Sequence, residues 1–172
     1  MSGDDELVEQ IRLGDENAAE TLITRYYASI LRYCRLHCPN LEKAEDLTQE
    51  TFLRLFRDLP KYKGKGCFRS YLYTIANHLC IDEGRKVQVY LLENEEEIAY
   101  SHDAMLQVEE KAEVRYLLSI LSPEQREAIV LRFGEQLSFR EIAKVTGCNM
   151  RTVQSRVRNA LKIMRKEREN ER

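Results

Sequence analysis

Apolar side chains recur every three or four residues along most of the chain, and this spacing predicts α-helices. One periodic run begins after Asp15 and stops at Pro39. A second helix is predicted over 41–59, with Asn40 as its N-cap, and a third over 68–84. No long stretch alternates apolar and polar positions as a half-buried β-strand does, so we expect an all-α protein.

The last third of the chain has the clearest helix boundaries. Ser122 and Ser138 each begin a capping box, because a glutamine or a glutamate stands three residues later. Pro123 then occupies the first helical position, where proline is well tolerated. Asn149 can cap a final helix that runs into a basic tail.

Residues 139–157, FREIAKVTGCNMRTVQSRV, have the spacing of a helix-turn-helix. Ala143 is small where two crossed helices would approach, and Gly147 can take the left-handed backbone of a tight turn. Ile142 and Val153 are apolar and could pack between the helices. An ordinary helical hairpin with a glycine cap gives the same pattern. The second helix favours DNA binding, because short hydrogen-bonding side chains stand beside arginines near its N-terminus.

Between the two periodic halves, residues 88–108 are acidic and only weakly periodic, which is typical of a linker. A chain of 172 residues is long enough for one ordinary domain or two small ones. We therefore expect two small helical domains, over 1–87 and 110–172, joined by a flexible acidic linker over 88–109.

The formal net charge of −2 hides a segregation of charge along the chain. Residues 149–168 are strongly basic and 61–90 moderately so, whereas 1–20 and 93–113 are acidic. Basic stretches attract nucleic acid, although any single one is more commonly a solvated helix face. The segregation indicates separate tasks along one chain.

Several classes of function lack support in the sequence. There is no phosphate-binding glycine loop and no nucleophile motif, so we expect neither enzyme activity nor a cofactor. No run approaches the roughly 18 apolar residues that cross a bilayer. The acidic start, MSGDDELVEQ, lacks the features of a signal peptide. We expect a cytoplasmic protein without direct membrane insertion.

The five cysteines favour free thiols in a reducing compartment. Cys34, His37 and Cys38 stand at helical spacing and offer three possible metal ligands, but no second motif supplies a fourth. Burial is favoured over metal binding here, so no metal is expected, and a redox role stays open.

The helix predicted over 41–59 has two different faces. Its inward stripe contains Ala44, Leu47, Thr48, Thr51, Phe52, Leu55 and Leu59. Leu53 stands on the other side, among polar and charged residues. An exposed leucine ringed by charge suits a protein–protein contact, although a single exposed leucine is also normal surface.

Three segments of the first half and one of the second resemble a known family. The segments are AEDLTQETFLRLFRDL, the basic loop KYKGKG, FRSYLYTIANHLCIDEGRK, and the helix-turn-helix preceded by SPEQREAIVLRF. The first three are similar to domain 2 of bacterial RNA polymerase sigma factors, and the last resembles sigma domain 4. This order, with a short linker and nothing more, resembles the extracytoplasmic-function (ECF) group over nearly the whole chain.

The resemblance implies a subunit that binds core RNA polymerase through its β′ clamp helices and β flap, and that recognises promoter DNA both as duplex and as single strand. It implies control by an anti-sigma factor. The residues that it assigns to polymerase binding are Asp46, Gln49, Glu50, Leu53, Arg54 and Arg57. Those assigned to the −10 element, including a flipped base, are Lys61, Lys63, Lys65, Tyr71, Thr74, His78, Asp82 and Arg85. Those assigned to the −35 duplex are Arg151, Thr152, Gln154, Ser155, Arg156, Arg158 and Lys162.

The helix over 68–84 also divides by face. Its inward stripe is predicted to contain Phe68, Leu72, Ile75, Ala76 and Leu79. Another side carries Tyr71, Thr74, His78, Asp82 and Arg85, and Tyr73 lies away from both, at a packing boundary. Tyr71 and His78 depart from the family pattern, in which tryptophan and asparagine are frequent. Tyr71 either stacks on a base or anchors the loop as a partly buried ring.

A self-sufficient DNA-binding repressor with a dimerising first domain is the second hypothesis. The face around Leu53 distinguishes the two, because a sigma factor binds core polymerase and a repressor binds operator DNA alone.

Overall fold

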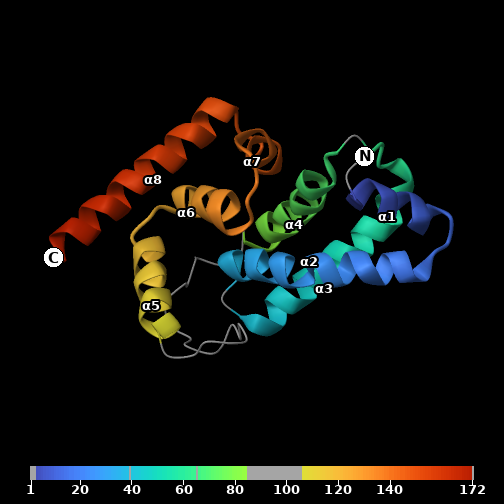
Figure 1. The fold of residues 1–172 in the computed structure, drawn as a ribbon, viewed down its shortest axis with the longest axis horizontal. Helices are drawn as coiled ribbons and strands as arrows, with labels where there is room; N and C mark the ends of the chain where they lie inside the picture. The colour runs from blue at the N-terminus through green and yellow to red at the C-terminus, as the bar shows by residue number, and fades with distance from the viewer. Residues whose placement is uncertain (1–2, 39, 65, 85–105, 172) are drawn as a thin grey trace.

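The computed structural model describes residues 3–38, 40–64, 66–84 and 106–171, and in these ranges every regular element is helical. Figure 1 shows the helices in chain order. They are α1 (Gly3–Arg12), α2 (Glu16–His37), α3 (Leu41–Asp58), the 3₁₀ turn η1 (Leu59–Lys61), α4 (Phe68–Gly84), α5 (Leu106–Ser119), α6 (Pro123–Ile129), the π-helical turn η2 (Val130–Gly134), α7 (Phe139–Thr146) and α8 (Met150–Asn170). The prediction of an all-α protein is confirmed.

The first half of the chain forms a bundle of α2, α3 and α4, with α1 packed on α2 (Figure 1). Leu22, Ile30, Leu55 and Leu72 are fully buried at its centre. The inward stripe predicted for α3 is confirmed, because all seven of its residues are buried. In α4 four of the five predicted inward residues are buried, and Ile75 is half-buried.

The predicted caps are present. The Asn40 side chain accepts a hydrogen bond from the Lys43 N–H at 3.2 Å, and Asn149 accepts one from Thr152 at 2.8 Å. Ser122 and Ser138 form complete capping boxes. These interactions satisfy N–H groups that have no partner within their own helix.

Three differences from the predicted helices stand out. The hydrophobic pattern predicted no helix before Asp15, whereas α1 spans Gly3–Arg12. The helix predicted to reach Leu59 ends at Asp58 and tightens into η1, because Pro60 cannot donate the next backbone hydrogen bond. In addition, α5 begins at Leu106, inside the predicted linker, and residues 85–105 of that region lie outside the described residues.

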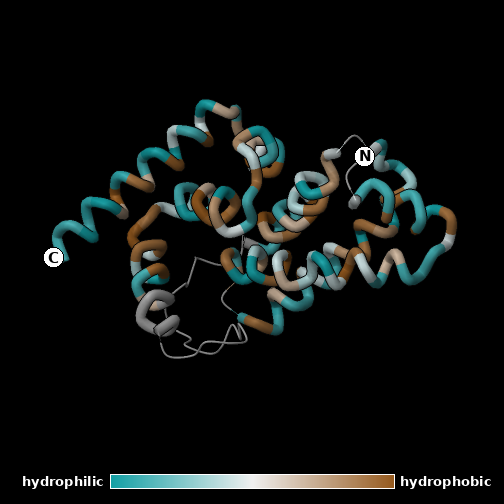
Figure 2. Tube along the Cα trace, viewed as in Figure 1, coloured by the Kyte–Doolittle hydropathy of each residue, from teal (hydrophilic) through white to brown (hydrophobic). Residues whose placement is uncertain are grey.

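The second half of the chain is built on α8, which contacts α5, α6 and α7. Leu121, Ile129, Val157 and Ala160 form a small core between α6 and α8. Figure 2 shows α8 as mainly hydrophilic, with apolar residues at intervals. The predicted turn is confirmed, since Gly147 has a φ of 69° between α7 and α8.

The two halves pack together through α4 and α7 (Figure 1). Leu131, Leu137, Ile142 and Val145 of the second half join the apolar cluster that fills the first half. The sequence predicted two modules but not this contact between them.

Among the residues that the structure describes, no helix is both long enough and apolar enough to span a membrane.

Candidate nucleic-acid and protein interfaces

The side of α3 that faces away from the core is polar with one apolar residue at its centre. The Leu53 side chain is 66% exposed. Asp46, Gln49 and Arg57 are also exposed on this helix. Glu50 and Arg54 are half-buried and form an ion pair with 2.9 Å between Arg54 Nε and Glu50 Oε1. The six residues predicted for polymerase binding therefore share a surface that nothing in the described chain covers fully.

The basic loop after η1 is held in place by α1. The Asp5 carboxylate is buried and accepts hydrogen bonds from the Tyr62 hydroxyl at 2.9 Å and from the Gly66 N–H at 2.8 Å. The Arg12 guanidinium donates to the carbonyl oxygens of Leu59, at 2.9 Å, and of Tyr62. Sequence reasoning missed both anchors, although Asp5 and Arg12 stand about two turns apart on the same face of α1.

The predicted −10 residues of the loop have different positions. Lys61 and Lys63 are exposed, whereas Lys65 lies outside the described residues. On α4, His78 and Asp82 are exposed, and Arg85 also lies outside the described residues.

A pocket of about 250 Å³ lies between the loop and α4. The Tyr71 ring packs on that of Tyr62, with 5.0 Å between ring centroids and 31° between the planes. Burial and the nearby Asp58 charge raise the pKa of the Tyr71 hydroxyl, which therefore stays protonated at neutral pH. The pocket is lined by Tyr62, Cys67, Ser70, Tyr71, Thr74 and Lys144.

Tyr71 packs on the loop, which is one of the two roles that the sequence left open, and it also lines a pocket. Stacking on a base stays a prediction. Thr74 lines the same pocket and donates its hydroxyl to the Ser70 carbonyl at 2.6 Å. Sequence reasoning missed the contributions of Tyr62, Cys67 and Ser70. His78 is not among the lining residues.

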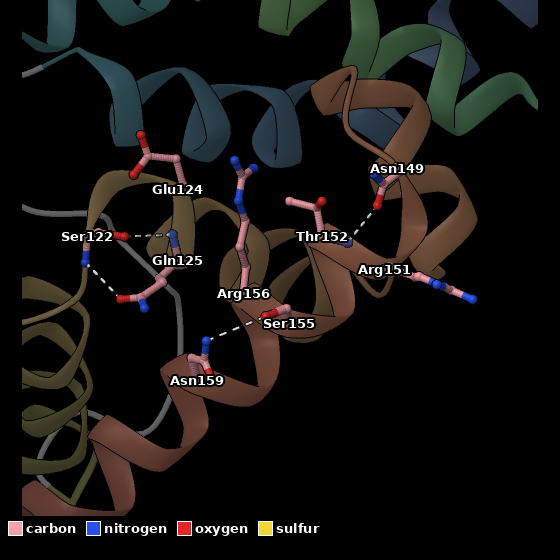
Figure 3. Close-up of a pocket in the computed structure, with 9 residues that line it drawn as sticks. All are labelled: Ser122, Glu124, Gln125, Asn149, Arg151, Thr152, Ser155, Arg156 and Asn159. Atoms are coloured by element: carbon pink, nitrogen blue, oxygen red, sulfur yellow. Dashed lines mark hydrogen bonds between the residues drawn. The ribbon is translucent and has the colours of Figure 1, made fainter.

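The N-terminal part of α8 borders a wide groove of about 540 Å³ (Figure 3). Its lining residues are Ser122, Glu124, Gln125, Asn149, Arg151, Thr152, Ser155, Arg156 and Asn159. Four of them were predicted to bind the −35 element. Figure 3 shows Arg151 pointing away from the other side chains, into solvent.

The other predicted −35 residues lie outside this groove. Arg158 and Lys162 are exposed farther along α8, and Gln154 is half-buried. Within the groove, Arg156 is turned partly inward, with 3.2 Å between its Nη1 and the Cys148 sulfur. Exposed cations beside short polar side chains at a helix N-terminus can bind phosphates and base edges.

Tyr73, which the sequence placed at a packing boundary, is 1% exposed. Its hydroxyl donates to the Glu135 carboxylate at 2.8 Å, so the ring is buried by the second half of the chain. Burial and the Glu135 charge raise its pKa, which keeps the hydroxyl protonated.

Cys34 and Cys38 are buried, as favoured from the sequence. A hydrogen bond with Cys34, together with burial, raises the pKa of the Cys80 thiol far above its usual range. His37 Nε2 lies 3.3 Å from the Glu127 carboxylate. In the described part of the chain, no group of three or more histidine, cysteine or acidic residues could hold a metal ion.

Comparison with known proteins matches both halves of the chain to one family. Residues 22–89 match Sigma-70 region 2, and residues 111–164 match Sigma-70 region 4. The RNA polymerase sigma-H factor of Pseudomonas aeruginosa is 31% identical over 170 residues, covering 90% of this chain and 88% of that protein. The ECF RNA polymerase sigma-E factor of Escherichia coli K12 has the same identity and coverage. The sigma factor YlaC of Bacillus subtilis is 30% identical, covering 91% of this chain and 97% of its own length.

Two solved structures have the same fold. CnrH, solved in complex with the cytosolic domain of CnrY, aligns with a TM-score of 0.73 and 22% identity, covering 98% of this chain and 99% of CnrH. The sigma factor RpoE of Bartonella quintana, solved with the anti-sigma factor NepR, aligns with a TM-score of 0.69 and 21% identity, covering 89% and 98% of the two chains.

Proposed function

The chain belongs to the sigma-70 family of RNA polymerase sigma factors, in the extracytoplasmic-function group, and from this premise we propose which surface performs each step of transcription initiation. In this proposal the protein is an initiation factor that works through binding rather than as an enzyme. Three surfaces make the proposed contacts: one on α3, one on α4 with its preceding loop, and one on α8.

The exposed face of α3 binds the β′ clamp helices of core polymerase. The observation that carries this assignment is Leu53, which is 66% exposed on a helix whose opposite side is entirely buried. Leaving an apolar side chain in water has a cost that docking removes, and the surrounding charges favour one orientation of the partner. The β flap is the partner proposed for the second module.

The pocket between the loop and α4 holds a base of the non-template strand at the −10 element. Flipping a base out of the stack costs a few kcal/mol, which a stacking surface can offset. The paired rings of Tyr62 and Tyr71 supply such a surface, and Lys61 and Lys63 supply positive charge for the phosphates. His78, Asp82, Lys65 and Arg85 remain proposed contacts of the same strand.

The N-terminal part of α8 reads the −35 element as duplex DNA. Arg151, Thr152, Gln154 and Ser155 stand where a recognition helix meets base edges. Arg156, Arg158 and Lys162 add contacts along the phosphate backbone. An anti-sigma factor is a further proposed partner, supported by the RpoE complex with NepR.

The test of the α3 assignment is the variant Leu53→Asp, measured for binding to purified core polymerase. A carboxylate in the centre of a docked surface has no partner, so we expect affinity to fall at least about tenfold with the fold unchanged. Leu13→Asp is the matched control, because Leu13 is 87% exposed and follows α1 directly, away from α3 in the chain. A correctly folded Leu53→Asp protein with normal affinity would contradict this docking face.

A further inference from the structure

We propose that α1 is a positioning element for −10 recognition, and that Asp5 is the residue through which it acts. Asp5 itself does not touch the DNA. It holds the loop after η1, so that the Tyr62 ring forms one wall of the pocket at Tyr71. This role rests on the function proposed above, because that function assigns the pocket to a base of the −10 element. The family match does not supply it, since that match begins at residue 22 and α1 ends at Arg12.

The loop between η1 and α4 does not fix its own path. Gly64 and Gly66 have φ values of 73° and 67°, in the left-handed region. Glycine occupies positive and negative φ about equally well, so neither position selects one conformation. Contacts from outside the loop must therefore hold it, and α1 supplies several of them.

Asp5 binds both ends of this loop with one carboxylate. Its Oδ1 accepts a hydrogen bond from the Tyr62 hydroxyl at 2.9 Å, and its Oδ2 accepts one from the Gly66 N–H at 2.8 Å. The residue is only 4% exposed. A buried carboxylate is tolerated where donors surround it, and hydrogen bonds to a charged acceptor are stronger than neutral ones. The carboxylate thus favours the one loop path that brings both donors to it.

Arg12 holds the start of the loop from the same face of α1. Its guanidinium donates to the carbonyl oxygen of Leu59 at 2.9 Å and to that of Tyr62. Asp5 therefore binds donors of the loop region, and Arg12 binds acceptors. Together they hold the segment against α1 from both kinds of polar group.

The Tyr62 ring carries this positioning into the pocket. It packs between two other rings, with 5.9 Å to the Phe68 centroid and 5.0 Å to that of Tyr71. Burial and the hydrogen bond to Asp5 raise the pKa of the Tyr62 hydroxyl, which therefore stays protonated as the donor at neutral pH. If the loop moved, this ring would leave the side of Tyr71 and a base would lose one of its two stacking partners.

The attachment of α1 to the rest of the bundle uses other residues. Asp4 accepts hydrogen bonds from the Tyr26 hydroxyl at 2.7 Å and from Arg25 at 2.6 Å, both on α2. Val8 is 1% exposed and belongs to the apolar core. Asp4 and Val8 thus hold the helix, whereas the Asp5 carboxylate holds the loop. The two tasks can be separated by substitution.

This division predicts which step of initiation depends on Asp5. The docking face at Leu53 and the −35 surface on α8 are built from other residues, so polymerase binding and duplex binding should be independent of Asp5. Capture of the single-stranded base should depend on it, because the pocket wall at Tyr62 and Cys67 belongs to the anchored segment.

The test measures how much affinity the holoenzyme gains from a single base. Oligonucleotides with the non-template −10 strand of a transcribed promoter carry an abasic site at each position in turn, and fluorescence anisotropy gives each Kd. The readout is the ratio of the abasic Kd to the intact Kd. Stacking of a captured base predicts a ratio of about five or more at one position for the wild-type protein. A general loss of stability would not change this ratio.

Two variants loosen the loop without removing a pocket ring. Tyr62→Phe deletes the hydroxyl that Asp5 holds, and Asp5→Ala deletes both acceptors. We expect the ratio to fall about threefold in Tyr62→Phe and to approach about one in Asp5→Ala. Asp5→Asn should keep most of the ratio, because its amide oxygen can accept from the Gly66 N–H while its nitrogen donates to the Tyr62 oxygen.

Tyr26→Phe is the matched control, because it removes the same kind of hydrogen bond to α1 from a ring that does not line the pocket. Its ratio should equal that of the wild-type protein. Affinities for core polymerase and for a −35 duplex should be unchanged in all variants. If Asp5→Ala has lost core binding, it has lost the fold, and the result for Tyr62→Phe decides.

A wild-type ratio in folded Tyr62→Phe and Asp5→Ala proteins would overturn the positioning role, as would an equal fall in Tyr26→Phe. A wild-type protein whose ratio is near one at every position would contradict the pocket assignment itself, and the positioning role with it. The two failures are distinguishable, since only the first leaves the wild-type protein sensitive to the missing base.

Discussion

Glu127 shows how one side chain joins the two modules. Glu127 lies on α6, and its carboxylate accepts a hydrogen bond from the Tyr33 hydroxyl of α2 at 2.5 Å. His37, also on α2, has its Nε2 atom 3.3 Å from the same carboxylate. Burial acts to raise the pKa of this carboxyl, but the hydrogen bonds and charges of His37, Tyr33 and Arg156 outweigh it and lower the pKa below its usual 4.5. The carboxylate is therefore the form that the packed molecule favours.

This shift predicts a pH dependence of stability. A lowered pKa contributes stability that is present above the ordinary carboxyl pKa and is lost as the pH falls through the lowered value. We expect the difference in Tm between the wild-type protein and Glu127→Gln to narrow as the pH falls below about 4.5. Thermal denaturation over a pH series measures this difference. A difference that stays constant, or widens in acid, would contradict the assignment.

Other single residues show why long-range contacts escape sequence reasoning. Asp5 reads as one acid in an acidic N-terminus, yet it holds a loop about sixty residues away, at Tyr62 and Gly66. Tyr73 was predicted only at a packing boundary, and no prediction was made for Asn77, yet both side chains are buried and bond to residues of the second module. Nothing near these residues in the chain signals their partners.

Helices and their ends were predicted well because their causes are local. The caps at Asn40, Ser122, Ser138 and Asn149 each act on an N–H three residues ahead. The faces of α3 follow from a spacing of three or four residues. The short helix α1 was missed because few apolar residues mark it, and its contacts are with α2 and the loop.

The turn of the helix-turn-helix gives a prediction at this scale. Gly147 has a φ of 69°, where any residue with a Cβ is strained although no atom lies within 4 Å of the added carbon. We expect Gly147→Ala to cost about 1 kcal/mol or more, which lowers Tm by about 3 °C. Gly134→Ala is the control, because Gly134 has no positive φ and its added Cβ would make an ordinary contact. Equal stability of both variants would contradict a strained turn.

The two ends of α8 should differ in what they contribute to DNA binding. Gln154→Ala removes a proposed base contact and should cost about 1–3 kcal/mol on promoters with an intact −35 element, but little when that element is scrambled. Lys166→Ala removes only charge and should weaken binding to both DNAs alike. Holoenzyme binding to the paired promoters measures this. An equal loss on both promoters for Gln154→Ala would refute the placement.

At the scale of the whole molecule, the two helical modules share one apolar cluster. The sequence predicted both modules and their order, because each has its own periodic pattern. It did not predict their contact, since Leu131, Leu137, Ile142 and Val145 look like residues of a self-contained second core. Burial against the first module and burial within the second have the same signature in the sequence.

The residues proposed for polymerase and promoter binding came from the family resemblance combined with helical faces. The structure adds Tyr62, Cys67 and Ser70 to the pocket at Tyr71, through a loop that Asp5 and Arg12 hold in place. It also reveals Lys144 from the other module in that pocket. Such a site, lined by the loop, α4 and α7 and anchored by α1, has no continuous signature in the sequence.

Run-off transcription with purified core RNA polymerase tests the central claim most directly. The wild-type protein should direct initiation at discrete promoters in a genomic library, and Leu53→Asp should reduce those transcripts while Leu13→Asp does not. Absence of promoter-dependent transcripts, together with tight binding of the free protein to duplex DNA, would contradict the account and favour a self-sufficient repressor.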